Sequence, residues 1–239
     1  MRFPLSALAD VRLGYPFRTR VTPDPQGETA LVQLADLNGG LLDTATLVRV
    51  HLAKIRTHFA LRPGDILFRA RSQLNDATYV ADLTLSPGVT RVVAAAPIMV
   101  VRVRPPAGPA GEGLPPGLAG LDARYLHWLL NHPQTQASLR AQSTGHSAEI
   151  LRKGDLEGLH LPVPPPAVQQ LIIEAAGLLE RERQLRRRLL EERFSMIQRQ
   201  LLRHAEADES AAENDDPPSR TSDAAQGQQS RTWARLEGI

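Results

Sequence analysis

The sequence predicts an α+β protein in three segments: a globular domain over residues 1–165, a long coiled-coil helix over 166–204 and an acidic, disordered tail over 205–239. Three observations predict it. Short β-like runs alternate with turn residues in the first segment, a three- and four-residue apolar spacing runs through the second, and the third is polar and acidic. Because the runs are not ordered as repeated βαβ units, the globular domain is expected to hold a mixed or antiparallel sheet.

The β-like runs and helices of the first segment can be placed from their patterns. The runs are LVQLADL at 31–37, DILFRA at 65–70, VVAAAPIMVVRV at 92–103 and LHLPV at 159–163. A short helical turn is predicted over 4–10, and a longer helix from Asp122 to Leu130 and on toward Ala141. Residues 105–120 are rich in proline and glycine, which predicts an exposed loop.

The second segment begins after three consecutive prolines at 164–166, where a missing amide hydrogen is harmless and the fixed φ favours initiation. Its apolar residues recur in steps of three and four, as in a coiled-coil seam. The seam residues are Leu171, Leu178, Leu185, Leu189 and Met196, with Ala175 between the first two. A seam of this length needs burial, and the polar tail cannot provide it.

Charge separates the body from the tail. The chain carries a formal net charge of +2, but residues 205–239 hold eight acidic residues and three arginines, which leaves residues 1–204 at +7. An arginine-rich basic body suits the neutralisation of nucleic-acid phosphates. Arginine richness alone is a weak indication, because it also follows genome composition.

Catalytic and metal-binding patterns are missing from the sequence. It has no cysteine, no GxxxxGK[ST] or GxGxxG loop, no HExxH pair and no GxSxG elbow around its serines. We therefore expect no catalytic residue, metal ligand or cofactor, and favour a binding protein. Because the start of the sequence lacks a signal-peptide pattern and no apolar run is long enough to span a membrane, we expect a soluble cytoplasmic protein.

The run TGHSAEILRKGDLEGLHLPVPPPAVQQLII at 144–173 resembles the end of a target recognition domain in the specificity subunit of type I restriction-modification systems. The resemblance extends over nearly all of residues 1–200. Its other segments are GYPFR at 14–18, VQLADLNGGLL at 32–42, LRPGDILFRARS at 61–72, AAAPIMVVRV at 94–103 and ARYLHWLLNHPQTQASL at 123–139.

The resemblance implies recognition of double-stranded DNA without catalysis. In that family a separate methyltransferase subunit modifies adenine N6, and a separate restriction and translocation subunit cleaves DNA. The usual member has two recognition domains joined by two long helices that pair antiparallel, whereas this sequence has one of each. Half-length members restore that layout by pairing two chains. A two-fold dimer would bury both seams and read two inverted half-sites.

The candidate DNA contacts are long polar side chains on loops. Arg69, Arg71, Gln73 and Asn75 alternate after the run at 65–68 and would share a face if that strand continued. Arginine can bond guanine, and glutamine or asparagine adenine, in the major groove. The alternative is an exposed polar strand or turn. Asp65, at the start of the strand, is predicted to be structural.

Two other regions complete the set of candidates. Arg18 and Arg20 flank a turn and either contact phosphate or are solvated. The resemblance places the loop with His146, Ser147 and Lys153 near DNA, although a local structural role explains His146 and Ser147 equally well. Tyr125, Trp128 and Leu129 are interpreted as core residues.

Two other functions remain open at this stage. The chain could be a scaffold or antagonist that binds a methyltransferase through its helix without reading DNA, or an enzyme with an unrecognised site. Salt-dependent DNA binding tests the first, and methyl transfer by the chain alone tests the second.

Overall fold

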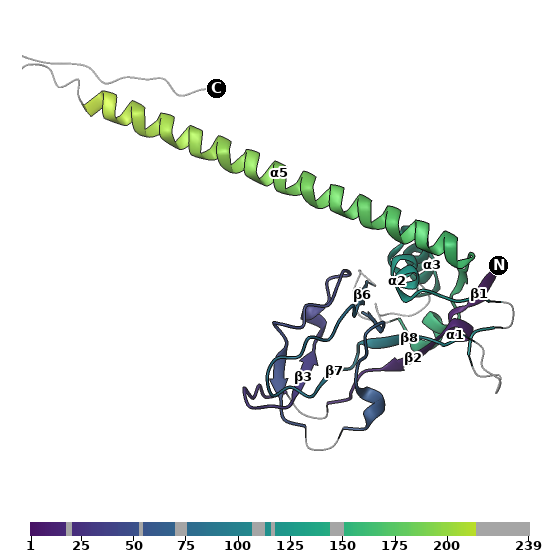
Figure 1. Cartoon of the computed structure of the whole chain (residues 1–239). Coiled ribbons are helices and arrows are strands. Elements are labelled where there is room, and N and C mark those ends of the chain that lie inside the picture. Colours follow the sequence, from purple (N-terminus) through teal and green to yellow (C-terminus); the bar gives the residue numbers. More distant parts are fainter. Residues whose placement is uncertain are drawn as a thin grey trace, which may run out of the picture. The chain divides into compact units, whose positions relative to one another are not determined.

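The computed structural model describes residues 1–17, 21–52, 55–69, 76–106, 113–115, 118–143 and 151–213, and the statements below concern these residues (Figure 1). The chain divides into two compact units, Met1–Arg181 and Glu182–Ile239, which are described separately.

Three sheets make up the first unit. A four-stranded antiparallel sheet has the order β2 (Ala9–Leu13), β8 (Met99–Val103), β5 (Ile66–Phe68), β6 (Ala77–Tyr79). A three-stranded sheet has the order β4 (Val48–Val50), β3 (Thr29–Val32), β7 (Arg91–Ala94), with β3 antiparallel to β4 and parallel to β7. The short strands β1 (Arg2–Pro4) and β9 (His160–Pro162) pair antiparallel. The predicted α+β class with mixed and antiparallel pairing is confirmed.

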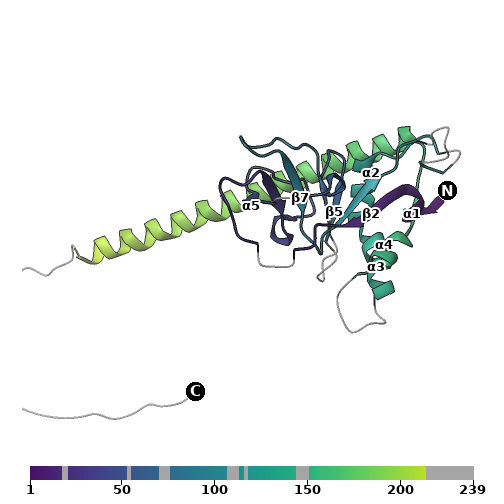
Figure 2. The ribbon, with the colours of Figure 1, turned by 90° about the horizontal axis from the view of Figure 1, so that it is seen from below.

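The four-stranded sheet has an apolar cluster on each of its faces. Figures 1 and 2 show β3 and β7 on one side of β2, and the helices of residues 5–8 and 123–131 on the other. Phe68, Met99 and Val101 lie in one cluster, together with residues of helices α1 (Leu5–Leu8), α2 (Ala123–Asn131) and α4 (Lys153–Glu157). Leu67 and Val100 lie in the other, together with residues of β3 and β7. Because successive residues of a strand face opposite sides, burial on both faces explains the nearly continuous apolar run at 92–103.

Some predicted elements differ in extent from the observed ones. The run at 92–103 forms two strands that are separated by the turn around Ala96–Pro97. The run at 31–37 ends as a strand at Val32 and continues as a 3₁₀ turn, η1 (Leu34–Asp36); a second such turn, η2, covers Thr57–Phe59.

The helix predicted from Asp122 toward Ala141 is two helices, α2 and α3 (Pro133–Ser143). His132 between them is extended, with φ −65° and ψ 136°, because a residue before proline is disfavoured in the helical region. The carboxylate of Asp122 caps α2 by accepting a hydrogen bond from the backbone N–H of Arg124.

The long helix α5 runs from Pro166 to Glu213, so it continues past the predicted end at His204. Residues 214–239 of the predicted tail lie outside the described part of the chain. The side chain of Gln169, only 1% exposed, holds the start of α5 in the first unit. Its amide accepts from the N–H of Asp122 at 2.9 Å and donates to the carbonyls of Gly120 at 2.9 Å and Pro164 at 2.8 Å. No helix in the described residues has the length and apolar character needed to cross a membrane.

Candidate nucleic-acid interface

Strand pairing brings the ends of two strands, each followed in the sequence by predicted DNA contacts, to the same end of the four-stranded sheet. β2 and β5 both pair antiparallel with β8, and Leu13 and Phe68 are both partners of Met99. The chain therefore leaves β2 and β5 at that end. The first exit leads toward Arg18 and Arg20, and the second toward Arg71, Gln73 and Asn75. Those five residues themselves fall outside the described ranges.

Of the four alternating residues predicted to contact DNA after β5, Arg69 is the one within the described part of the chain. β5 ends at Phe68, so Arg69 begins the connection to β6 and is not a residue of the strand. Its Nε lies 2.8 Å from Oδ1 of Asp76, its backbone N–H donates to the carbonyl of Asp76, and its Nη2 donates to the carbonyl of Leu37. The guanidinium therefore closes the base of the β5–β6 hairpin, and a DNA contact would compete with these partners.

A polar junction joins the same hairpin to the segment 37–41 and to α2. Oγ1 of Thr78, which is fully buried, accepts hydrogen bonds from the backbone N–H groups of Asn38 at 3.2 Å and Gly39 at 3.0 Å. Side chains of His127 and Asn131 reach the junction from α2. The residues of α2 that were predicted to lie in the core are Tyr125, Trp128 and Leu129, and this polar pair was not predicted.

Asp65 lies at the opposite end of β5, in a buried ion cluster. Its carboxylate is bonded by Arg102, accepts the backbone N–H of Arg62 at 2.8 Å and lies 3.6 Å from Nη2 of Arg12. Burial, with Arg102 nearby, lowers the pKa of the Arg12 guanidinium. The predicted structural role of Asp65 is confirmed.

Lys153 is the first residue of α4, and its ammonium lies 3.3 Å from Oε1 of Glu157 across one helical turn. Both side chains are solvent-accessible, so the pair leaves Lys153 free to exchange partners. His146 and Ser147 belong to residues 144–150, which the structure does not describe. Among the described residues no cluster of three or more His, Asp or Glu could hold a metal ion.

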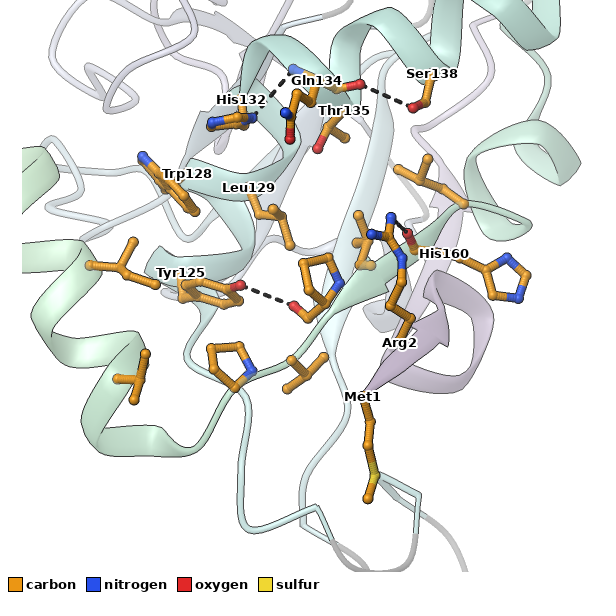
Figure 3. A pocket seen from close by; sticks show the side chains of 17 residues that line it. Met1, Arg2, Tyr125, Trp128, Leu129, His132, Gln134, Thr135, Ser138 and His160 are labelled. Carbon is orange, nitrogen blue, oxygen red and sulfur yellow. Dashed lines mark hydrogen bonds between the residues drawn. The ribbon is translucent and has the colours of Figure 1, made fainter.

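A groove of about 440 Å³ lies between α2 and α3 on one side and the β1–β9 pair and the start of α5 on the other (Figure 3). Its lining is mainly apolar, with Trp128, Leu129 and Val163 among the residues, and Arg2 and His160 lie on the β1–β9 side. The phenol of Tyr125 donates to the carbonyl of Pro162 at 3.0 Å. Tyr125 and Leu129 are buried and Trp128 packs against the core, as predicted.

The seam residues of α5 have no apolar partner within the described chain. Their exposed fractions lie between 53% and 66% for Leu171, Leu178, Leu185, Leu189 and Met196. We call these five residues stripe A. At 3.6 residues per turn, a second set lies about 120° further around the helix. This stripe B is also exposed and consists of Leu179, Leu190, Phe194, Ile197 and Leu201.

The residues of stripe B were not among the predicted seam residues, although the three- and four-residue steps from Leu190 to Leu201 are visible in the sequence. A single stripe suits a two-helix coiled coil, whereas two stripes on one helix suit a bundle of three or four helices.

We compared the sequence and the structure with those of known proteins. No protein-family model and no curated protein match the sequence. The structure is similar to a chain from a study of complex assembly and conformational transition in the type I R-M system, with a TM-score of 0.51 and 16% identity over 76% of this chain. The chain spans only 38% of the length of that solved chain.

Two further solved structures are similar at a TM-score of 0.48, each over 76% of this chain. One is the HsdS subunit from Thermoanaerobacter tengcongensis, at 16% identity and 37% of its own length. The other is the type I restriction-modification S subunit from M. genitalium, at 13% identity and 39% of its own length. Over 76% of its length, the chain therefore shares the fold of that solved chain from the type I R-M system.

Proposed function

We propose that this chain is a non-catalytic, DNA-recognising specificity subunit that directs an adenine-N6 methyltransferase to its target site. The observation that carries the proposal is the shared fold, reinforced by the sequence resemblance that runs through residues 14–173. In this proposal residues 1–165 read DNA, the helix from 166 onward joins subunits, and the acidic tail takes no part in reading.

The end of the four-stranded sheet where β2 and β5 finish supports the proposed recognition of DNA. Strand pairing places the ends of β2 and β5 at one end of the four-stranded sheet. In the sequence, Arg18 and Arg20 follow the first strand, and Arg71, Gln73 and Asn75 follow the second. These side chains carry the donors and acceptors that distinguish base pairs in the major groove. The net charge of +7 over residues 1–204 favours the approach to phosphates.

Stripes A and B of α5 support the proposed contacts with partner subunits. Burying a leucine stabilises a complex by about 1.5–3 kcal/mol, so two exposed rows of large apolar residues indicate two helical contacts. We assign stripe A to α5 of a second copy, which brings a second recognition domain into the complex. Stripe B then faces helices of the methyltransferase. A restriction and translocation subunit would join the assembled complex as a further partner.

Methylation by a reconstituted complex tests the proposal. The chain is co-expressed with an adenine-N6 methyltransferase subunit of a type I restriction-modification system from its own genome, and modified adenines are mapped by sequencing. We expect N6-methyladenine at one sequence made of two inverted half-sites, and only when both proteins are present. The methyltransferase expressed alone is the control. Methylation without this chain, or at unrelated sites, would contradict the proposal.

Salt-dependent DNA binding separates this function from the scaffold alternative. That alternative draws support from Arg69, whose guanidinium is bonded within the chain. We expect the complex to bind a duplex of its own site at low salt and to lose affinity steeply as salt rises. A complex that assembles through α5 but has no duplex affinity at low salt would instead be a scaffold or antagonist.

A further inference from the structure

We infer that His127 and Asn131 of α2 are positioning residues that set the accuracy of base reading at the DNA-reading end of the sheet. The inference rests on the proposed function. Their hydrogen bonds run to backbone groups of Ala77 and Gly39 and to each other, so these two residues would influence sequence preference without contacting DNA.

Asn131 bonds both backbone groups of Ala77, the first residue of β6. Its Oδ1 accepts the N–H of Ala77 at 2.9 Å, and its Nδ2 donates to the carbonyl of Ala77 at 2.8 Å. The carboxamide thus takes the place of a neighbouring strand at the base of the hairpin. The same Nδ2 lies 3.1 Å from the carbonyl of Gly39, so one side chain ties β6 to the segment 37–41.

His127 lies one helical turn before Asn131 and therefore on the same face of α2. Its Nε2 is 3.1 Å from the carbonyl of Gly39 and 2.9 Å from that of Ala77, the same two acceptors. Both acceptors require Nε2 to carry the proton. The imidazole also lies beside the ring of Tyr79 in β6, at a centroid distance of 5.8 Å.

The junction links the β5–β6 hairpin to the segment 37–41, so that a movement of one is transmitted to the other. Gly39 has φ +75°, and a Cβ there would stand 3.4 Å from Cβ of Asp76. Asp76 in turn pairs with Arg69 across the hairpin base. A shift of Ala77 or Gly39 would therefore move the end of the β5–β6 hairpin next to its connection, where Phe68 pairs with Ala77, and the exposed residues of the segment 37–41. These exposed residues are Asn38 and Leu41.

Discrimination between bases requires that the side chains that contact them are held in a fixed position. A bidentate contact to a base discriminates by about 1–3 kcal/mol, and only while its donors stay within about 0.5 Å of the right position. Backbone hydrogen bonds from side chains are directional, whereas apolar contacts are not. A polar pair at the junction therefore specifies the position of the reading segments, as a satisfied buried network does elsewhere.

The test compares two amide side chains, half-buried Asn131 and buried Gln169, in the reconstituted complex with the methyltransferase. Asn131→Leu removes the bonds to Ala77 and Gly39. Gln169→Leu is the matched control, since that amide also bonds three backbone groups, at the start of α5 and away from the hairpin. A cognate duplex and a duplex with one altered base pair compete in one reaction, so the ratio of their methylation rates does not depend on the folded fraction.

We expect Asn131→Leu to lower this discrimination ratio about tenfold and Gln169→Leu to leave it within about twofold of wild type. His127→Phe keeps the ring beside Tyr79 but removes donation from Nε2, and should lower the ratio in the same direction. It decides the question alone if Asn131→Leu does not fold.

The inference is overturned if both α2 variants keep the wild-type ratio, or if Gln169→Leu lowers it equally. The proposed function fails separately, if the wild-type complex methylates the two duplexes at the same rate.

Discussion

The carboxylate of Asp65 accepts hydrogen bonds from Nε and Nη2 of Arg102, both at 2.6 Å, at a position where Asp65 is only 1% exposed. Asp65→Asn should lower the free energy of unfolding by about 3–5 kcal/mol, because it leaves partly buried guanidinium groups without a counter-charge. Urea unfolding monitored by circular dichroism measures the loss.

Asp10→Asn is the control for the Asp65 prediction. Asp10 forms an ion pair with Arg104 at 2.9 Å, but its side chain is 65% exposed. Water screens that pair, so its removal should cost about 1 kcal/mol or less. Equal losses for the two variants would show that the burial of Asp65 does not determine its contribution to stability.

The buried imidazole of His127 predicts a loss of stability in mild acid. Burial lowers the pKa of His127 below 6.5, against the opposing effect of its bonds to Gly39 and Ala77. The unfolded chain binds a proton as pH falls through about 6.5, and the folded protein does so only at lower pH. The free energy of unfolding should therefore fall with pH below about 6.5, until the folded pKa is passed.

His127→Gln should reduce this pH dependence, measured by urea unfolding in a series from about pH 7 to about pH 5. His51→Gln, at an exposed position, controls for the loss of one histidine. An unchanged slope in His127→Gln would mean that other groups account for the acid sensitivity.

Each predicted β-like run overlaps at least one strand. DILFRA and VVAAAPIMVVRV overlap the buried strands β5, β7 and β8, and the runs at 31–37 and 159–163 overlap β3 and β9. β1, β2, β4 and β6 were missed, because their three to five residues include polar side chains or a proline and give no apolar run. Their pairing is also distant in sequence, as with Ala9 and Val103, so local patterns could not show it.

The candidate site was predictable in its residue types and not in its geometry. The position of Asp65 at the start of a strand predicted a structural role, and its hydrogen bonds to Arg102 confirm that role. The junction could not be predicted, because Asn131 and His127 bond backbone groups of Gly39 and Ala77 that lie far away in sequence. Only the fold brings those carbonyls within reach of α2.

Stripe A should pair two copies of the chain. The double variant Leu185→Glu with Leu189→Glu places two charges in the proposed helix contact. It should convert a dimer into a monomer with weakened site preference, because burial of each leucine stabilises the contact by about 1.5–3 kcal/mol. Light scattering after size-exclusion chromatography measures the mass. The control is Gln184→Glu with Arg188→Gln, which changes the net charge by the same amount outside both stripes. A double leucine variant that remains dimeric would assign stripe A to another contact.

Stripe B should bind the methyltransferase, so its variants separate the two contacts of α5. Leu190→Glu with Phe194→Glu replaces two exposed residues, at 65% and 64% exposure, with charges on the other side of the helix. We expect this variant to stay dimeric and to fail to co-purify with the methyltransferase, because charged side chains cannot be buried against apolar helices without a partner. The stripe A variant is its reciprocal control. Loss of both contacts in both variants would show instead that α5 presents one continuous surface, and that the two stripes do not bind separate partners.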